Sequence, residues 1–166
     1  MAKKSLQQLM SDWREASDKL KKFQGDLPMI MGQESVKVIK DNFKQEGYDS
    51  GSGIVKWQQR SPKTNKAYDR RSGVKGTTYN SNSPLLRQTL TLYNSLMFRV
   101  TGKSVFVGTN TSLVPYAPYN NEGTNKGLPQ RKFIPANGEP ANPKIIKRIE
   151  RKIASVRNEI MKNFKR

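Results

Sequence analysis

Apolar residues recur at three- and four-residue spacing in two neighbouring stretches near the start of the chain. In the first stretch, Ser5 and Gln8 form a capping-box pattern, and apolar side chains follow it up to Gly25, a residue that commonly stops a helix. In the second stretch, a proline falls where the first turn of a new helix would lie, as is typical of helix starts. The pattern therefore predicts two amphipathic helices, one over residues 1–25 and one over residues 26–47.

The periodic pattern disappears between residues 48 and 84. Glycines alternate there with lysines and arginines, and Trp57 stands among them. Stretches of this length without regular structure are uncommon in compact domains, where they are usually functional or disordered. We therefore expect an extended basic loop over residues 48–84.

A β-hairpin is predicted where apolar and polar residues alternate on both sides of Gly102. Glycine at the first central position suits a two-residue type II′ turn. The register of such a turn pairs Val100 with Val105. It also pairs Phe98 with Val107, so these four side chains are expected to share one face of the hairpin.

Three further elements are expected in the last third of the chain. Residues 114–123 suit a short helix or turn, and residues 128–134 suit a strand. Asn142 followed by Pro143 is typical of a helix start, and isoleucines then recur at three- and four-residue spacing. The pattern predicts a long C-terminal helix over residues 142–166 with one apolar face and strongly basic other faces.

These elements predict one domain over residues 1–166 and an α+β fold. We expect a small antiparallel β-sheet with a hairpin, packed against long N- and C-terminal helices, together with an extended loop. Hydrophobic residues make up only 34% of the chain, which is little for a domain of this length. Part of the chain is therefore expected to depend on partners for its order.

Charge is the strongest compositional feature. The 31 lysines and arginines against 13 aspartates and glutamates give a net charge of +18 at pH 7. Such an excess attracts polyanions through counterion release, although a run of charge is more often a solvated face. The residues that we expect to face DNA come from the loop and from the C-terminal helix: Lys63, Lys66, Arg70, Arg71, Lys147 and Arg151.

Candidate chemistry is sparse. The chain has no histidine and no cysteine, which removes the commonest general base and metal ligand as well as every thiolate. The phosphate-binding pattern G-x-x-x-x-G-K-[ST] is absent. Asp41, Glu46 and Asp49 form the one candidate metal or acid–base group, and acidic residues at such positions are mostly solvated. We therefore expect no enzyme activity, no cofactor and no metal.

No stretch of the sequence predicts contact with a membrane. The longest apolar runs have four residues or fewer, and the first residues lack the apolar stretch of a signal peptide. We therefore expect assembly in a cytoplasm.

Four segments, in order, resemble the phage virion-morphogenesis and tail-completion family. Residues 42–60 are similar to its helix end, glycine-containing turn and tryptophan, and residues 86–96 to its pattern L-x-x-T-G-x-L-x-x-S-[IL]. Residues 105–123 are similar to its V-x-V-G-T strand followed by Y-A-x-x-H-x-x-G, and residues 128–134 to P-x-R-x-F. Two positions differ, because Leu90 stands at the usual glycine and Asn120 at the frequent histidine.

The resemblance implies a structural protein of a bacteriophage tail or head–tail junction. It implies a tail completion, terminator or neck component that assembles, often as a homo-oligomeric ring, with other tail or connector proteins near genomic DNA. The expected location is the virion. The alternatives are a packaging protein that binds nucleic acid without sequence preference and a divalent-metal nuclease that uses the three carboxylates named above.

Four residues are candidates for the subunit interface: Trp57, Tyr116, Arg131 and Phe133. Trp57 either covers the protein's own core or anchors a neighbour, since tryptophan is enriched at interface hot spots. Arg131 either covers apolar surface with its stem or pairs with a carboxylate of a neighbouring subunit. Strand alternation would place Arg131 and Phe133 on one face.

Overall fold

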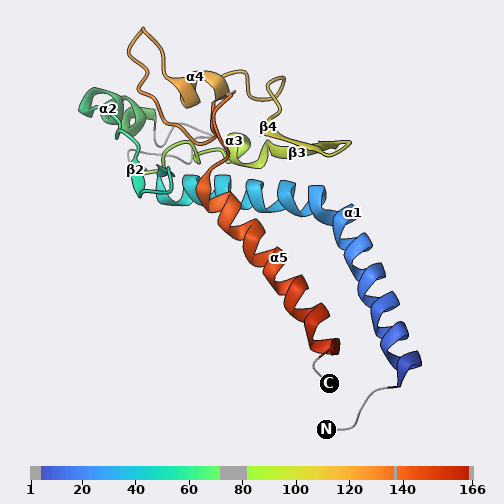
Figure 1. Ribbon diagram of the computed structural model, residues 1–166. Helices are drawn as coiled ribbons and strands as arrows, with labels where there is room; N and C mark the ends of the chain where they lie inside the picture. Colours follow the sequence, from blue (N-terminus) through green and yellow to red (C-terminus); the bar gives the residue numbers. More distant parts are fainter. Residues whose placement is uncertain (1–4, 72–81, 137, 165–166) are drawn as a thin grey trace.

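The computed structural model describes residues 5–71, 82–136 and 138–164, and it confirms the α+β fold class with a β-hairpin (Figure 1). Two long helices dominate it, and both sheets have two strands. In chain order the elements are α1 (Leu6–Gln45), β1 (Gly47–Asp49), β2 (Ile54–Lys56), α2 (Pro62–Arg71), α3 (Thr91–Asn94), β3 (Leu96–Thr101), β4 (Ser104–Thr109), α4 (Ala117–Glu122) and α5 (Pro143–Phe164).

The prediction of two N-terminal helices is wrong, because α1 continues through Gly25 as one helix of 40 residues. Its start is as expected: Ser5 Oγ accepts a hydrogen bond from the backbone N–H of Gln8, and Gln8 returns one to the backbone N–H of Ser5. Pro28 lies inside the helix and removes one backbone hydrogen bond. Such a proline bends a helix without ending it, and Figure 1 shows α1 bent near its label.

The second half of α1 supports most of the fold, whereas its first half extends away from it (Figure 1). Helix α5 leaves the same region and descends beside that first half, so the start of α1 and the end of α5 lie at one end of the molecule. We call residues 6–26 of α1 and 150–162 of α5 the arm, and the remaining described residues the body.

The prediction of an extended loop over residues 48–84 is wrong where the chain forms two short strands and helix α2. Strands β1 and β2 form a short antiparallel hairpin, in which Gly51 and Gly53 have positive φ angles of 91° and 145°. Helix α2 follows, and Ser61 Oγ accepts a hydrogen bond from the backbone N–H of Thr64 at its start. Residues 72–81 of the predicted loop lie outside the described residues. Serine followed by proline was a helix-start signal that the sequence analysis did not use.

The β3–β4 hairpin has the predicted register, with Val100 opposite Val105 and Phe98 opposite Val107. Gly102 has a positive φ of 59°, as a type II′ turn requires at its first central residue. The hairpin lies against α1 at Gly32, where a Cβ atom would be 2.1 Å from a ring carbon of Phe98. This close approach is possible because glycine has no side chain.

Residues 128–134 do not form the predicted strand, although they are followed by the expected helix α5. Polar groups from elsewhere in the chain satisfy their backbone instead. Asn121 Oδ1 accepts hydrogen bonds from the N–H groups of Phe133 (2.9 Å) and Ile134 (3.0 Å). Asn42 Nδ2 donates to the Phe133 carbonyl, and Trp57 Nε1 donates to the Lys132 carbonyl at 2.7 Å. The segment is therefore extended and bonded mainly to side chains rather than to a neighbouring strand.

The core of the body is built around Phe43, which is fully buried on α1. The ring of Trp57 meets it edge-on at a centroid distance of 5.5 Å, and the ring of Tyr93 does so at 5.9 Å. Phe133 lies against it at 4.9 Å. Helix α1, the 47–57 hairpin segment, α3 and the extended 128–134 segment therefore share one aromatic cluster.

Ion pairs hold the start of α5 against α1. Arg148 Nη2 lies 2.7 Å from Asp41 Oδ2, and its Nη1 lies 3.6 Å from Glu34 Oε2. Lys37 Nζ donates to the other oxygen of Glu34 at 2.7 Å. At the N-terminus of α5, Asn142 Oδ1 accepts the N–H of Lys144, which confirms the predicted cap.

Acid should weaken this junction through Glu34, which is 7% exposed. The hydrogen bond from Lys37 and the charges of Lys37, Arg148 and Lys152 hold its pKa below the ordinary value of 4.5. A lowered folded-state pKa contributes stability above the ordinary value, and this contribution is lost as pH falls through the folded-state pKa. We expect Glu34→Gln to reduce the free energy of unfolding by about 1–2 kcal/mol at pH 7, and this difference to shrink as the pH falls below 4.5.

Urea denaturation of both proteins between pH 7 and pH 3 measures this. The exposed Glu122, changed to glutamine, is the control and should follow the wild type at every pH. A constant difference between Glu34→Gln and wild type over the whole range would contradict the expectation.

Leu90 adopts a left-handed backbone conformation, with φ 57° and ψ 0°, just before α3. A β-branched or bulky residue is strained there by about 1–2 kcal/mol, whereas glycine is not. The side chain is 42% exposed, so its removal loses little buried apolar surface. We expect Leu90→Gly to raise the free energy of unfolding by about 1 kcal/mol in thermal or urea denaturation. Leu90→Ala keeps the strain, and a glycine variant no more stable than the alanine variant would refute this.

Candidate functional site

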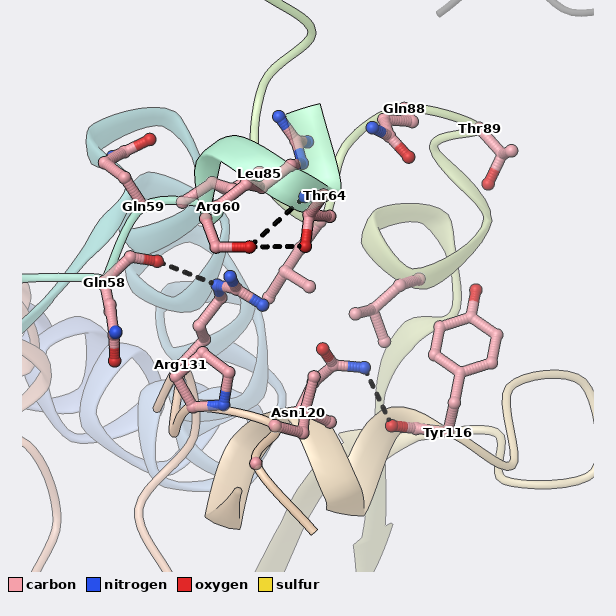
Figure 2. Close-up of a pocket in the computed structure, with 16 residues that line it drawn as sticks. Gln58, Gln59, Arg60, Thr64, Leu85, Gln88, Thr89, Tyr116, Asn120 and Arg131 are labelled. Atoms are coloured by element: carbon pink, nitrogen blue, oxygen red, sulfur yellow. Dashed lines mark hydrogen bonds between the residues drawn. The ribbon is translucent and has the colours of Figure 1, made fainter. Parts of the chain in front are cut away.

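A polar pocket of about 510 Å³ opens on the side of the body (Figure 2). Four segments form it: residues 58–64, residues 85–92, the start of α4 and residues 127–131. Two of the four predicted interface residues, Tyr116 and Arg131, line it. The sequence alone does not show that these four segments meet, because their proximity depends on the tertiary structure.

The lining of the pocket is rich in hydrogen-bond donors. It contains two guanidinium groups, four primary amides and four hydroxyl groups, and none of the lining residues is an aspartate or glutamate. These polar residues are Arg60, Arg131, Gln58, Gln59, Gln88, Asn120, Ser61, Thr64, Thr89 and Tyr116. Such a lining suits an occupant that presents oxygen acceptors, such as a carboxylate.

Hydrogen bonds hold Arg131 in the lining of this pocket. Its Nε donates to the Gln58 carbonyl at 3.2 Å, and its backbone N–H donates to the Asn120 carbonyl at 2.7 Å. The residue is 7% exposed, and Figure 2 shows its guanidinium group among the lining side chains. Asn120, at the position where the family often has histidine, donates its amide to the Tyr116 carbonyl at 3.0 Å.

The segment before α3 has unusual local features. Leu86 and Leu90 both have positive φ angles, of 58° and 57°. Between them, Arg87 Nε and Gln88 Nε2 are buried and have no hydrogen-bond partner among the described residues. Backbone strain and unsatisfied hydrogen-bond donors are more frequent where a protein contacts a ligand or a neighbouring subunit than elsewhere.

Trp57 and Phe133 are not available at the surface. They are 4% and 1% exposed, respectively, and both belong to the aromatic cluster around Phe43. Trp57 therefore takes the first of its two predicted roles, as part of the protein's own core. We reassign both residues from the subunit interface to the core, because they have almost no surface left to offer a neighbour.

The residues predicted to face DNA lie on two separate elements. Lys63, Lys66 and Arg70 are exposed on α2, and the side chain of Arg71 lies outside the described residues. Lys147 and Arg151 are exposed on α5, which Figure 1 shows well apart from α2. The predicted DNA-facing residues therefore belong to two different helices.

The three carboxylates considered for metal binding have other partners. Asp41 pairs with Arg148, and Asp49 lies 3.4 Å from Lys144. Glu46 Oε1 accepts the backbone N–H of Leu85 at 2.7 Å and joins two parts of the body. Within residues 5–71, 82–136 and 138–164, no group of three or more acidic side chains could hold a metal ion.

A second hollow, of about 560 Å³, runs along the arm between α1 and α5. Its lining is apolar except for one arginine: Trp13, Ala16, Leu20, Phe23, Ile153, Val156, Arg157, Ile160 and Met161. Several of these side chains are strongly exposed, including Trp13 at 67% and Leu20 at 47%. We call this hollow the arm groove. The two apolar stripes are visible in the sequence, but the sequence does not show that they face each other.

Comparison with family models, with curated proteins and with solved structures found no match. Among the described helices, none has a stretch apolar and long enough to cross a bilayer.

Proposed function

We propose that this chain is a structural subunit of a bacteriophage tail or head–tail junction, as a tail completion, terminator or neck component. It acts in the virion by assembling with copies of itself and with other tail or connector proteins, close to the path of the DNA. It is not an enzyme. The proposal starts from the four ordered segments that resemble the family and draws further support from the two hollows.

The arm groove is the observation that carries the proposal. Soluble monomers rarely expose contiguous apolar surface of more than a few hundred square ångströms, and larger patches mark interaction sites. Here seven large apolar side chains of the arm are at least 38% exposed: Leu6, Leu9, Met10, Trp13, Leu20, Ile153 and Met161. A surface of this kind suits a protein that works as part of an assembly.

The polar pocket supports the same proposal. A buried arginine beside amides and hydroxyls could accept a carboxylate, and we propose that a neighbouring subunit supplies it to Arg131. The net charge of +18 also favours acidic or polyanionic partners beside the copies of this chain, since they would offset its positive charge.

Native mass spectrometry of the purified protein and of intact phage particles tests this proposal. We expect the chain to be present in particles in a fixed copy number, and particles assembled without it to lack a complete tail or a stable head–tail joint. Recovery of the chain only as a free monomer, with normal particles forming in its absence, would refute the proposal.

A second candidate is a packaging protein that binds nucleic acid without sequence preference. The observation that favours it is the exposed basic face of α2, with Lys63, Lys66 and Arg70. It predicts binding to any duplex, with the logarithm of affinity falling linearly as the logarithm of salt concentration rises. Weak or salt-independent binding in a fluorescence anisotropy titration would exclude this candidate and leave the structural role unaffected.

A further inference from the structure

Both helices of the arm carry the repeat that is typical of coiled coils. In such a repeat, apolar residues alternate at spacings of three and four and form a seam along one side of the helix. In α1 the seam is unbroken over residues 6–30: Leu6, Leu9, Trp13, Ala16, Leu20, Phe23, Leu27 and Ile30. In α5 it consists of Ile146, Ile149, Ile153, Val156 and Ile160. Seams of this kind pack against other helices.

Within one chain, the two seams meet along one edge only. The helices run in opposite directions, and Lys19 Nζ lies 3.9 Å from Glu159 Oε1. Ala16 and Ile160 are 4% and 7% exposed beside this contact. Lys19 and Glu159 hold the same position of the repeat, immediately before a seam residue, which is the pairing expected of antiparallel helices.

The other edge of the seam is open. Leu6 and Trp13 are 73% and 67% exposed on α1, and Ile146 and Ile153 are 44% and 43% exposed on α5. These side chains occupy positions that a coiled coil normally buries. The arm is therefore one antiparallel helix pair whose seam is only half covered.

The exposed surface of the whole chain agrees with this. A compact protein of 18.9 kDa is expected to expose about 8,300 Å². This chain exposes 11,958 Å². A standard interface needs roughly 800 Å² per partner, and a chain less compact than expected leaves more of its surface open to such a contact.

The charges on α5 and on the first half of α1 indicate which kind of helix suits the arm groove. Helix α5 carries seven basic and two acidic residues, and Lys144 and Arg148 pair with carboxylates of the body. The first half of α1 is balanced, with four acidic and four basic residues between Leu6 and Asp26. A second α5 beside the first would be repelled, whereas a second α1 would bring carboxylates to it. The chain therefore contains the helix that suits its own open edge.

We propose that the arm is completed by the arm of a second copy of this chain, so that two α1–α5 pairs form an antiparallel four-helix bundle with two-fold symmetry. In this bundle each α5 lies between its own α1 and the α1 of the other copy, and the exposed seam residues fill the core. The inference rests on the proposed assembly function and names the partner and the surface for one of its contacts.

Sedimentation equilibrium of the full chain, from about 1 to 200 μM, tests the pairing. We expect wild type to associate as a dimer, and Trp13→Glu and Leu20→Glu to weaken dimerisation at least tenfold, since each places a charge in the bundle core. Leu113→Glu is the control: Leu113 is 66% exposed outside the arm, and the variant should sediment as wild type does. The aromatic near-ultraviolet circular dichroism of the body reports whether each variant still folds.

Two results would overturn the inference. One is a wild-type protein that stays monomeric throughout this range. This is also the result expected if an acidic helix of another protein, and not a second copy, occupies the arm groove. The other is a folded Leu20→Glu variant that associates as tightly as wild type. Dimerisation in solution together with absence from particles would refute the proposed function and leave the pairing standing. Presence in particles with a monomeric protein in solution would refute the pairing alone.

Discussion

Replacing Phe43 with alanine is expected to lower the free energy of unfolding by about 3–5 kcal/mol, the usual cost of emptying a large aromatic site in a core. Phe43 is fully buried and contacts three other rings, from Trp57, Tyr93 and Phe133. These rings belong to four separate segments, so the cavity would loosen the whole body. A loss of this size is a large part of the total stability of a domain.

Urea denaturation followed by tryptophan fluorescence measures the effect, because Trp57 lies in the same cluster. Phe106→Ala is the matched control, since this phenylalanine is 57% exposed on the outer face of the hairpin. It should cost well under 1 kcal/mol. Equal losses in the two variants would show that the aromatic cluster is not the centre of the fold.

Two glycines of α1 should respond in opposite ways to the same substitution. At Gly32, a Cβ atom would lie 2.1 Å from Cδ2 and 2.5 Å from Cγ of Phe98, so the β3–β4 hairpin must move. We expect Gly32→Ala to reduce the free energy of unfolding by about 1–3 kcal/mol. At Gly25 no atom lies within 4 Å of the added carbon, and alanine should stabilise the helix by up to about 1 kcal/mol.

Thermal denaturation of the two variants compares these effects directly. Both variants replace glycine with alanine in the same helix, so the gain in helix propensity is the same. The difference between their free energies of unfolding therefore measures the effect of the contact with Phe98. If Gly32→Ala proves as stable as Gly25→Ala, the hairpin does not lie against α1 at this point.

Three local features of the fold were predicted correctly. The capping box at Ser5, the type II′ turn at Gly102 and the cap at Asn142 each involve residues a few positions apart. Their physical causes, a side-chain acceptor or a positive φ angle, are contained within the segment itself. The register of the β3–β4 hairpin followed directly from its turn.

Two of the errors arose where distant parts of the chain decide the outcome. Gly25 permits a helix end but does not require one, and the seam continues through it to Ile30. Alternation in residues 128–134 indicates an extended backbone, but not whether a strand or the side chains of Asn42, Trp57 and Asn121 will satisfy it.

The candidate sites also combine features that the sequence predicted with features that only the folded chain shows. Arg131 and Tyr116 were predicted individually, yet only the folded chain shows that they line one pocket. The arm groove was within reach of the sequence, since both seams can be traced residue by residue. What the sequence did not indicate is that one edge of the helix pair closes at Lys19 and Glu159 while the other stays open.

Hydrogen exchange at two protein concentrations tests most directly whether a second copy completes the arm. If pairing covers the open seam, amides of residues 6–25 and 150–162 should exchange slowly at high concentration and at least tenfold faster on dilution. Amides of residues 33–43, in the body half of α1, should exchange at the same rate under both conditions. Equally slow exchange in the arm and in the body of a dilute, monomeric protein would contradict the account.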